Sequence, residues 1–189
     1  MKEKPVKQNR KKQYTRMVLR DSLMELMKTR TISDISIKEI CAAADISRST
    51  FYAHYRDQYD LLQKTEEEIL EAVNSIIKKH DYRDVRRGAL QMVEEILQYI
   101  AGNNKSIQVL LSENGDINFQ KKLFGSIYQK HVVTILDSRT TNERTREYYF
   151  MFIVNGSTGL IYHWIKNNMD TPVNELARLI INITKQIGR

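Results

Sequence analysis

The stretch that decides the fold runs from Ser36 to Leu62 and reads SIKEICAAADISRSTFYAHYRDQYDLL. It contains three helix starts in quick succession. Ser36 and Glu39 stand at the two positions of a capping box, in which the serine hydroxyl accepts from the Glu39 N–H and the glutamate reaches back. Ser47 and Asp57 carry side-chain oxygens that can cap a helix in a similar way. The pattern therefore predicts helices that begin at Ser36, Ser47 and Asp57.

The turn between the first two of these helices is very short, because only Asp45 and Ile46 separate them. Aspartate tolerates a left-handed backbone better than most residues, so a sharp reversal can form at this point. The small side chains of residues 41–44 let the two helices approach closely. Two short helices joined in this way cross steeply, as in a helix-turn-helix unit. Its second helix, from about Ser47 to Tyr55, is then expected to read DNA.

Apolar residues at helical spacing extend on both sides of this unit. A helix is expected before it at about 9–29, and the helix that Asp57 caps should continue to about 79. The first 87 residues contain no glycine, which excludes a Gly-rich phosphate loop there. Thr171 and Pro172 predict an N-cap followed by proline at the first helical position. The sequence therefore predicts an all-α chain, with later helices at about 85–101, 106–111, 118–136, 142–168 and 171–187.

The charge of the chain is concentrated at its N-terminus. The 189 residues carry a formal charge of +7, from 30 basic and 23 acidic side chains. Residues 1–20 hold eight of the basic groups and one acid, so the remaining residues carry 22 of each sign. An isolated basic arm is as often a solubilising tail as a binding element. Beside a helix-turn-helix unit, it favours a polyanionic partner.

Composition and residue spacing argue against several classes of protein. There is one cysteine, Cys41, no secretory signal is visible, and no apolar stretch approaches the ~20 residues of a membrane span, so a cytoplasmic protein without a membrane partner is expected. The four histidines are scattered with no second ligand at helical spacing, and no nucleophile–base motif or paired carboxylates occur. We therefore expect no metal, no cofactor and no enzymatic activity. An all-α enzyme and a helical protein–protein module are the rival classes.

The exposed face of the third helix supplies the candidate DNA contacts. Arg48 is the best candidate for a bidentate contact to guanine, because helices in the major groove read bases with their N-terminal residues. Ser49 and Thr50 could reach a base edge or a phosphate, whereas Tyr52 and His54 more plausibly bind phosphates. The alternative is a plain solvated helix face. A second tier of phosphate candidates comprises Ser36, Lys38, Thr15 and Arg16.

The segment Ser36–Leu62 resembles the DNA-binding signature of the tetracycline-repressor (TetR) family. The resemblance is carried by Ile40, Cys41, Ala44, Ser47, Arg48, Ser49, Thr50, Phe51, Tyr52 and Tyr55. Three features depart from the family pattern: Asp45 replaces the common turn glycine, the 30–35 connector has no glycine, and Gln58 replaces a lysine that contacts phosphate. Residues 155–180, NGSTGLIYHWIKNNMDTPVNELARLI, are similar to the last two helices of some members.

This resemblance implies a helix-turn-helix domain with a basic arm at 1–60 and a helical regulatory and dimerisation domain at 61–189. It implies a homodimeric repressor on double-stranded operator DNA, controlled by a small-molecule effector of unspecified class. An activator or coactivator that works through protein contacts is the alternative. Apolar stripes supply the predicted dimer interface, which we favour over intrachain core as the alternative: Ile153, Gly156, Ser157, Leu160, Trp164, Leu176, Ile180 and Ile183. The predicted effector pocket is formed by Met92, Tyr99, Phe124, Tyr128, Tyr148 and Phe152.

Overall fold

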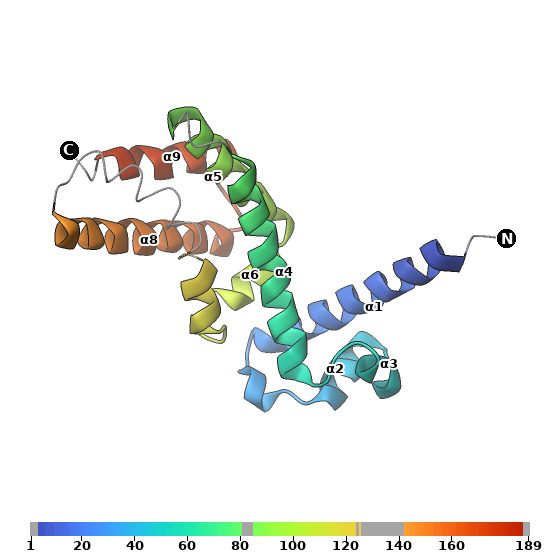
Figure 1. Ribbon diagram of the computed structural model, residues 1–189. Helices are drawn as coiled ribbons and strands as arrows, with labels where there is room; N and C mark the ends of the chain where they lie inside the picture. Colours follow the sequence, from blue (N-terminus) through green and yellow to red (C-terminus); the bar gives the residue numbers. More distant parts are fainter. Residues whose placement is uncertain (1–3, 81–84, 124, 126–141, 187–189) are drawn as a thin grey trace. The chain divides into compact units, whose positions relative to one another are not determined.

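The computed structural model describes residues 4–80, 85–123, 125 and 142–186 (Figure 1). Helices and turns account for these residues and no strand occurs among them, which confirms the all-α prediction. The elements are α1 (Lys4–Met27), a 3-10 turn (Ile32–Asp34), α2 (Ile37–Ala44), α3 (Arg48–Tyr52), α4 (Gln58–Lys79), α5 (Val85–Gly102), α6 (Asn104–Leu110), a helical segment at 117–123, α8 (Glu143–Lys166) and α9 (Val173–Gln186).

Contacts divide the chain into two compact units. Unit 1 comprises Met1–Glu68 and Val109–Asp116, and unit 2 comprises Ile69–Gln108 and Ile117–Arg189. The division falls within α4, so this helix contributes to both units. The predicted domain boundary at residue 60 stays a prediction.

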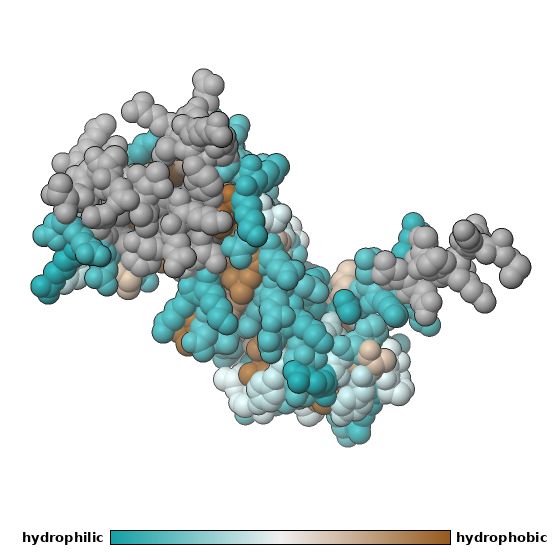
Figure 2. All heavy atoms as spheres, viewed as in Figure 1, coloured by the Kyte–Doolittle hydropathy of each residue, from teal (hydrophilic) through white to brown (hydrophobic). Residues whose placement is uncertain are grey.

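The core of unit 1 forms where α1 packs on α2 and α2 packs on α3. Leu19, Leu23 and Met27 lie at helical spacing on α1 and are fully buried. Ile40 of α2 and Phe51 of α3 are also fully buried. Each such side chain contributes roughly 1.5–3 kcal/mol when it leaves water. Hydrophilic side chains cover most of the described surface visible in Figure 2. Because Leu19, Leu23 and Met27 bury one side of α1, the residues on the opposite side of this helix face solvent.

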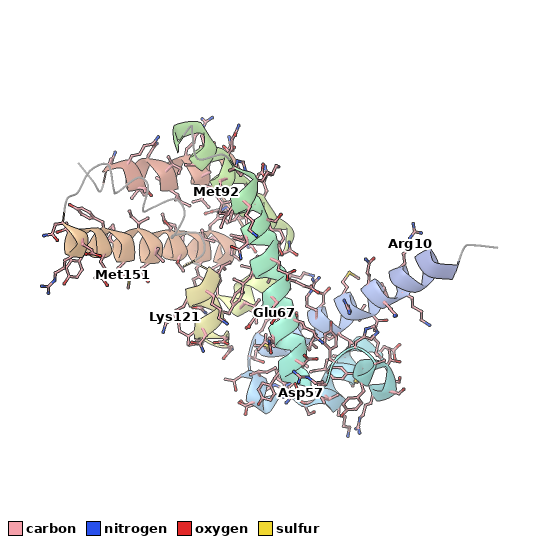
Figure 3. The ribbon with its side chains drawn as sticks, in the orientation of Figure 1. Arg10, Asp57, Glu67, Met92, Lys121 and Met151 are labelled. Carbon is pink, nitrogen blue, oxygen red and sulfur yellow. The ribbon has the colours of Figure 1, made fainter. Side chains whose placement is uncertain are left out.

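The core of unit 2 includes α5, α8 and α9. Met92 and Leu97 of α5, Trp164 of α8 and Ala177 of α9 are each at most 3% exposed. The Trp164 indole Nε1–H donates to the Thr171 carbonyl oxygen at 2.7 Å, which joins the end of α8 to the start of α9. In contrast, Met151 projects from α8 and is half exposed (Figure 3).

The start of α9 differs from the prediction by one position. The helix begins at Val173, and the first helical hydrogen bond runs from the Leu176 N–H to the Pro172 carbonyl at 3.1 Å. Proline is therefore the residue before the helix rather than its first residue. The Thr171 carbonyl accepts from the Trp164 indole N–H instead of from a helical N–H. Of the helix predicted at 118–136, only 118–123 and 125 belong to the described residues, where 117–123 is helical.

Candidate nucleic-acid interface

The turn between α2 and α3 has the geometry that the sequence predicts. Ser36 caps α2: its Oγ accepts from the Glu39 N–H at 3.3 Å, and the Ser36 N–H donates to Glu39 Oε2 at 2.9 Å. Asp45 adopts the left-handed conformation at φ 51° and ψ 44° and ends α2. The Ile46 N–H then donates to the Cys41 carbonyl at 3.0 Å. These contacts reverse the chain within two residues and confirm the predicted reversal.

Hydroxyl groups gather at the start of α3. Ser47 Oγ accepts from the Thr50 N–H at 3.2 Å, so it caps the helix. The same oxygen lies 2.9 Å from both Ser49 Oγ and Thr50 Oγ1. These hydroxyl groups can each donate or accept, as contacts to base edges or phosphate oxygens require. Their mutual hydrogen bonds hold the first turn of α3 in one arrangement.

The helix α3 ends earlier than predicted, at Tyr52 rather than Tyr55. After Tyr55 the chain turns into α4, whose start Asp57 caps: the Asp60 N–H donates to Asp57 Oδ1 at 2.8 Å. The Arg56 N–H donates to Asp60 Oδ2 at 3.0 Å, so it does not continue the bonding pattern of α3. The last bond of that pattern runs from the Tyr55 N–H to the Phe51 carbonyl at 2.9 Å.

The side chains of α3 and of the residues just after it divide into a packed set and an exposed set. Phe51 is fully buried and Tyr55 is 5% exposed, as expected for packing residues. Arg48, Ser49 and Tyr52 are exposed, and Thr50 is partly exposed. The predicted base-reading and phosphate-binding side chains of α3 are therefore accessible.

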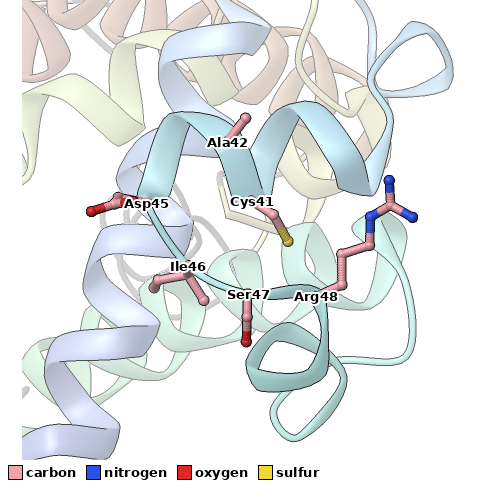
Figure 4. A pocket seen from close by; sticks show the side chains of 6 residues that line it. All are labelled: Cys41, Ala42, Asp45, Ile46, Ser47 and Arg48. Atoms are coloured by element: carbon pink, nitrogen blue, oxygen red, sulfur yellow. The ribbon is translucent and has the colours of Figure 1, made fainter.

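A shallow hollow of about 360 Å³ lies against the turn, and Figure 4 shows the side chains around it. The Arg48 guanidinium is close enough to Cys41 for its charge to act on the thiol. Burial raises the pKa of the Cys41 thiol, and the Arg48 charge offsets this only in part. Cys41 is therefore a small packing residue, while Arg48 extends from the first turn of α3. The hollow is lined by Cys41, Ala42, Asp45, Ile46, Ser47 and Arg48.

The structure separates the second-tier phosphate candidates. Arg16, Ser36 and Lys38 are exposed. Thr15 is only 7% exposed, because it lies one turn before Leu19 on the buried face of α1. The expectation that its hydroxyl contacts phosphate is thus corrected: Thr15 packs within unit 1. The Ser36 hydroxyl is engaged with Glu39, to which it also donates at 2.7 Å.

His54 lies at the end of α3 among cations from two other helices. Burial lowers the pKa of His54, and the charges of Arg16, Lys12 and Lys64 lower it further. The Lys64 Nζ also donates to the His54 carbonyl at 3.3 Å. The charges of Arg16 on α1 and of Lys64 on α4 therefore both act on His54, which lies just after α3.

Lys12 and Lys64 were not identified as candidates from the sequence. Lys12 precedes Arg16 by one helical turn on the same face of α1, and this spacing could have identified it. Lys64 lies one turn after Asp60, and the two form an ion pair at 2.9 Å. Asp60 is 6% exposed, and the hydrogen bond from Lys64 lowers the pKa of its carboxyl group, as does the bond from the Arg56 N–H.

The residues predicted for the dimer interface fall on two faces of their helices. Ile153, Trp164, Leu176 and Ile180 are buried within the single chain, so its own packing accounts for them. Ser157 and Leu160 are partly exposed, and Gly156 and Ile183 are exposed. The exposed faces of α8 and α9 also carry large apolar side chains. These are Tyr148, Met151 and Phe152 on α8 and Leu179 beside Ile183 on α9.

The residues predicted for an effector pocket do not share one environment. Met92 is buried and Tyr99 is partly exposed, while Tyr148 and Phe152 are each 63% exposed. Phe124 and Tyr128 lie outside the described residues.

Two further findings bear on the excluded classes. Among the described residues, no group of three or more His, Cys, Asp or Glu side chains could hold a metal ion. Within the same part of the chain, no helix is long and apolar enough to cross a membrane.

Comparisons with known proteins add to this geometry. Residues 89–186 match the family described as a transcriptional regulator C-terminal region, TetR_C_8. The chain is 18% identical over 171 residues to the uncharacterized HTH-type transcriptional regulator YxbF of Bacillus subtilis (strain 168), which covers 89% of this chain. The chain spans 44% of the length of that relative.

Three solved structures share the fold. A TetR transcriptional regulator from Streptococcus agalactiae 2603V is 19% identical, with a TM-score of 0.64 over 95% of this chain and 98% of the other. The dihydroxyacetone kinase operon activator DhaS is 18% identical, with a TM-score of 0.59 over 92% and 96%. The fatty acid degradation regulator FadR from Bacillus halodurans is 11% identical, with a TM-score of 0.62 over 89% and 93%.

The capped pair of helices with an exposed α3 defines a helix-turn-helix DNA-binding protein. With the match over residues 89–186, the chain belongs to the TetR family of transcriptional regulators. These relatives are regulators rather than enzymes.

Proposed function

We propose that this regulator binds its operator as a homodimer and acts as a repressor, with α3 in the major groove. The observation that carries the proposal is the exposed face of α3. Arg48 and Ser49 project from a first turn that the Ser47 cap and two hydroxyl–hydroxyl contacts hold in place. A helix whose N-terminal side chains are exposed and ordered can present a bidentate donor to a guanine.

A homodimer would supply the second half of the recognition surface. One helix of five residues buries too little for tight binding, whereas a twofold dimer reads two half-sites. The exposed apolar side chains of α8 and α9 support a contact between copies of the chain, because contiguous apolar patches on a surface mark interaction sites.

An effector in the C-terminal domain would weaken operator binding if it bound the free and DNA-bound forms unequally. This part rests on the TetR family, and Met92 and Tyr99 stay candidates for the contact. The alternative is an activator. One protein with the same fold, DhaS, is named as an operon activator. Transcription in vitro from a promoter with the operator at its natural position distinguishes repression from activation.

Duplex binding at two salt concentrations tests the proposal directly. A protein that neutralises several phosphates loses affinity steeply as salt rises. We expect tight binding of a mixed-sequence 30-base-pair duplex at 50 mM salt and a loss of roughly 10³-fold or more at 200 mM. Absence of binding at 50 mM, or an affinity that salt does not change, would refute DNA regulation through this surface.

A further inference from the structure

The connection between α3 and α4 supports an inference that deepens the proposed function and rests on it. Residues 53–57 join the end of α3 to the start of α4. Two side chains of α4, Asp60 and Lys64, lie about one helical turn apart, and both bond to the backbone of this connection. We call these two side chains the exit clamp, because they hold the chain where it leaves α3.

The exit clamp contacts three successive residues of the connection. Lys64 Nζ donates to the His54 carbonyl oxygen at 3.3 Å and lies 5.2 Å from the centroid of the Tyr55 ring. The Arg56 N–H donates to Asp60 Oδ2 at 3.0 Å. Lys64 Nζ also donates to this carboxylate oxygen, at 2.9 Å, so the two clamp residues are bonded to each other. Residues 54–56 are therefore tied to the beginning of α4.

The exit clamp reaches into the core of unit 1. Asp60 is 6% exposed, and a carboxylate that loses its hydration needs hydrogen-bond donors in return. The Lys64 ammonium and the Arg56 N–H are such donors. Tyr55, whose ring Lys64 faces, is buried and lies 5.8 Å from the ring of Phe51, between centroids. The clamp therefore joins the end of α3 to the same core that holds its middle.

A helix as short as α3 depends on contacts of this kind for its orientation. It has five residues, whereas an isolated helix of fewer than about 12 residues is marginal in water. The Ser47 cap holds its first turn, and Phe51 holds its middle in the core. Side chains of a binding site must be placed to within about 0.5 Å and 10–20°. Arg48 can therefore read a base only while both ends of α3 are held.

We propose that Asp60 and Lys64 are positioning residues for sequence recognition by α3. They act through the backbone of residues 54–56 and not through a contact of their own with DNA. Because Asp60 neutralises the charge of Lys64, the pair adds little to the attraction of phosphates. Without the clamp, the protein keeps its affinity for duplexes of any sequence, while α3 no longer keeps its reading orientation. Discrimination between the operator and other sequences is then lost.

The test measures binding to two 30-base-pair duplexes, one selected by the wild type from a random pool and one of mixed sequence. The clamp variant is Asp60→Asn/Lys64→Met, which removes both charges and so leaves the net charge of the chain unchanged. The control Lys79→Met/Glu95→Gln removes, in the same way, an ion pair of 3.1 Å between α4 and α5. A further variant, Lys64→Arg, keeps a cation that can pair with Asp60.

We expect the clamp variant to lose roughly tenfold or more in the ratio of selected to mixed-sequence affinity, the cost of about one base contact. Its affinity for the mixed-sequence duplex, and the dependence of that affinity on salt, should match the wild type. The control and Lys64→Arg should keep the wild-type ratio. An unchanged ratio in the clamp variant would overturn the proposal. Uniform weakening with a reduced salt slope would also overturn it, and would assign Lys64 to a phosphate.

A second measurement uses the unaltered protein, in case the clamp variant fails to fold. Because the Arg56 amide donates to a buried carboxylate, it should exchange its hydrogen far more slowly than an unstructured amide. Exchange at the unstructured rate would show that the connection is not held, and would overturn the proposal. A wild type that discriminates between the duplexes no better than the clamp variant does would reject only this inference. A wild type that binds neither duplex would reject the proposed function and, with it, the clamp.

Discussion

The Arg30 guanidinium donates to Glu39 Oε1 at 2.8 Å, while the other carboxylate oxygen of Glu39 accepts from the Ser36 N–H at 2.9 Å. One side chain thus closes the capping box of α2 and ties α2 to the connector after α1. The hydrogen bond from Arg30, followed by those from Ser36, lowers the pKa of Glu39 from 4.5 to about 2.

This pKa predicts an acid dependence of stability. The carboxyl group is more acidic in the folded chain than in the unfolded chain, so it contributes stability above pH 4.5 that is lost as the pH falls toward 2. Glu39→Gln should flatten the fall in urea midpoint between pH 5 and pH 2.5. The control is Glu67→Gln, whose carboxylate accepts from Gln63 and sits on the exposed side of α4. An equally steep fall in Glu39→Gln would contradict the assignment.

Adjacent residues of α3 should differ sharply in their effect on stability. Phe51 is fully buried, so Phe51→Ala should lower the free energy of unfolding by about 3–5 kcal/mol. Tyr52 is 58% exposed, so Tyr52→Ala should cost about 1 kcal/mol or less while weakening duplex binding. Chemical denaturation and duplex titration of both variants check this. Comparable losses of stability would show that the helix is packed differently.

Local contacts explain which parts of this fold could be predicted from sequence. The Ser36–Glu39 box and the left-handed Asp45 depend on residues within a few positions of each other, and both were predicted. That the bonding pattern of α3 stops after Tyr55 depends on the bond from the Arg56 N–H to the Asp60 side chain. The start of α9 depends on Trp164, which takes up the Thr171 carbonyl. Competing partners of this kind are not visible in a periodic pattern.

At the candidate DNA-binding site, too, the sequence predicts local features and misses those that depend on tertiary packing. Arg48, Ser49 and Tyr52 could be predicted as exposed because the motif fixes the phase of a short helix. Burial of Thr15 followed from its spacing to Leu19, and the prediction overlooked this. The charge of Lys12 acts on His54, 42 positions further along the sequence, only because of tertiary packing, so no local signal contains this effect.

Two arginines should have separable roles in DNA binding. Arg48 lies in the first turn of α3, so Arg48→Ala should lose discrimination between operator and random duplex, by about 1–3 kcal/mol at one base position. Arg16 lies on α1, so Arg16→Ala should weaken all sequences alike and reduce the salt slope by about one. Binding of both variants to a selected operator and its point mutants measures the difference. Uniform weakening by Arg48→Ala would assign that side chain to phosphate.

One glycine is required by its surroundings. A Cβ atom on Gly115 would collide with the carbonyl oxygen of Leu110, so Gly115→Ala must shift the segment that follows α6. We expect a loss of about 1–3 kcal/mol in stability. Gly102, at the end of α5, has no heavy atom near the position of its Cβ and provides the matched control. Gly102→Ala should leave the unfolding midpoint unchanged or raise it slightly, and equal losses would remove the steric argument.

The exposed faces of α8 and α9 predict how the protein assembles. Leu179 and Ile183 are one turn apart on α9 and are 46% and 37% exposed in the single chain. A charge at Ile183 would be desolvated without a partner if this face lies between two copies, so Ile183→Glu should shift the chain from dimer to monomer at micromolar concentration. Light scattering measures the mass, and circular dichroism checks that the helices persist. Asn174→Glu, an exposed position near the start of α9, should leave the mass unchanged. A dimeric Ile183→Glu variant of undiminished stability would place the interface elsewhere, and its operator affinity should then equal that of the wild type.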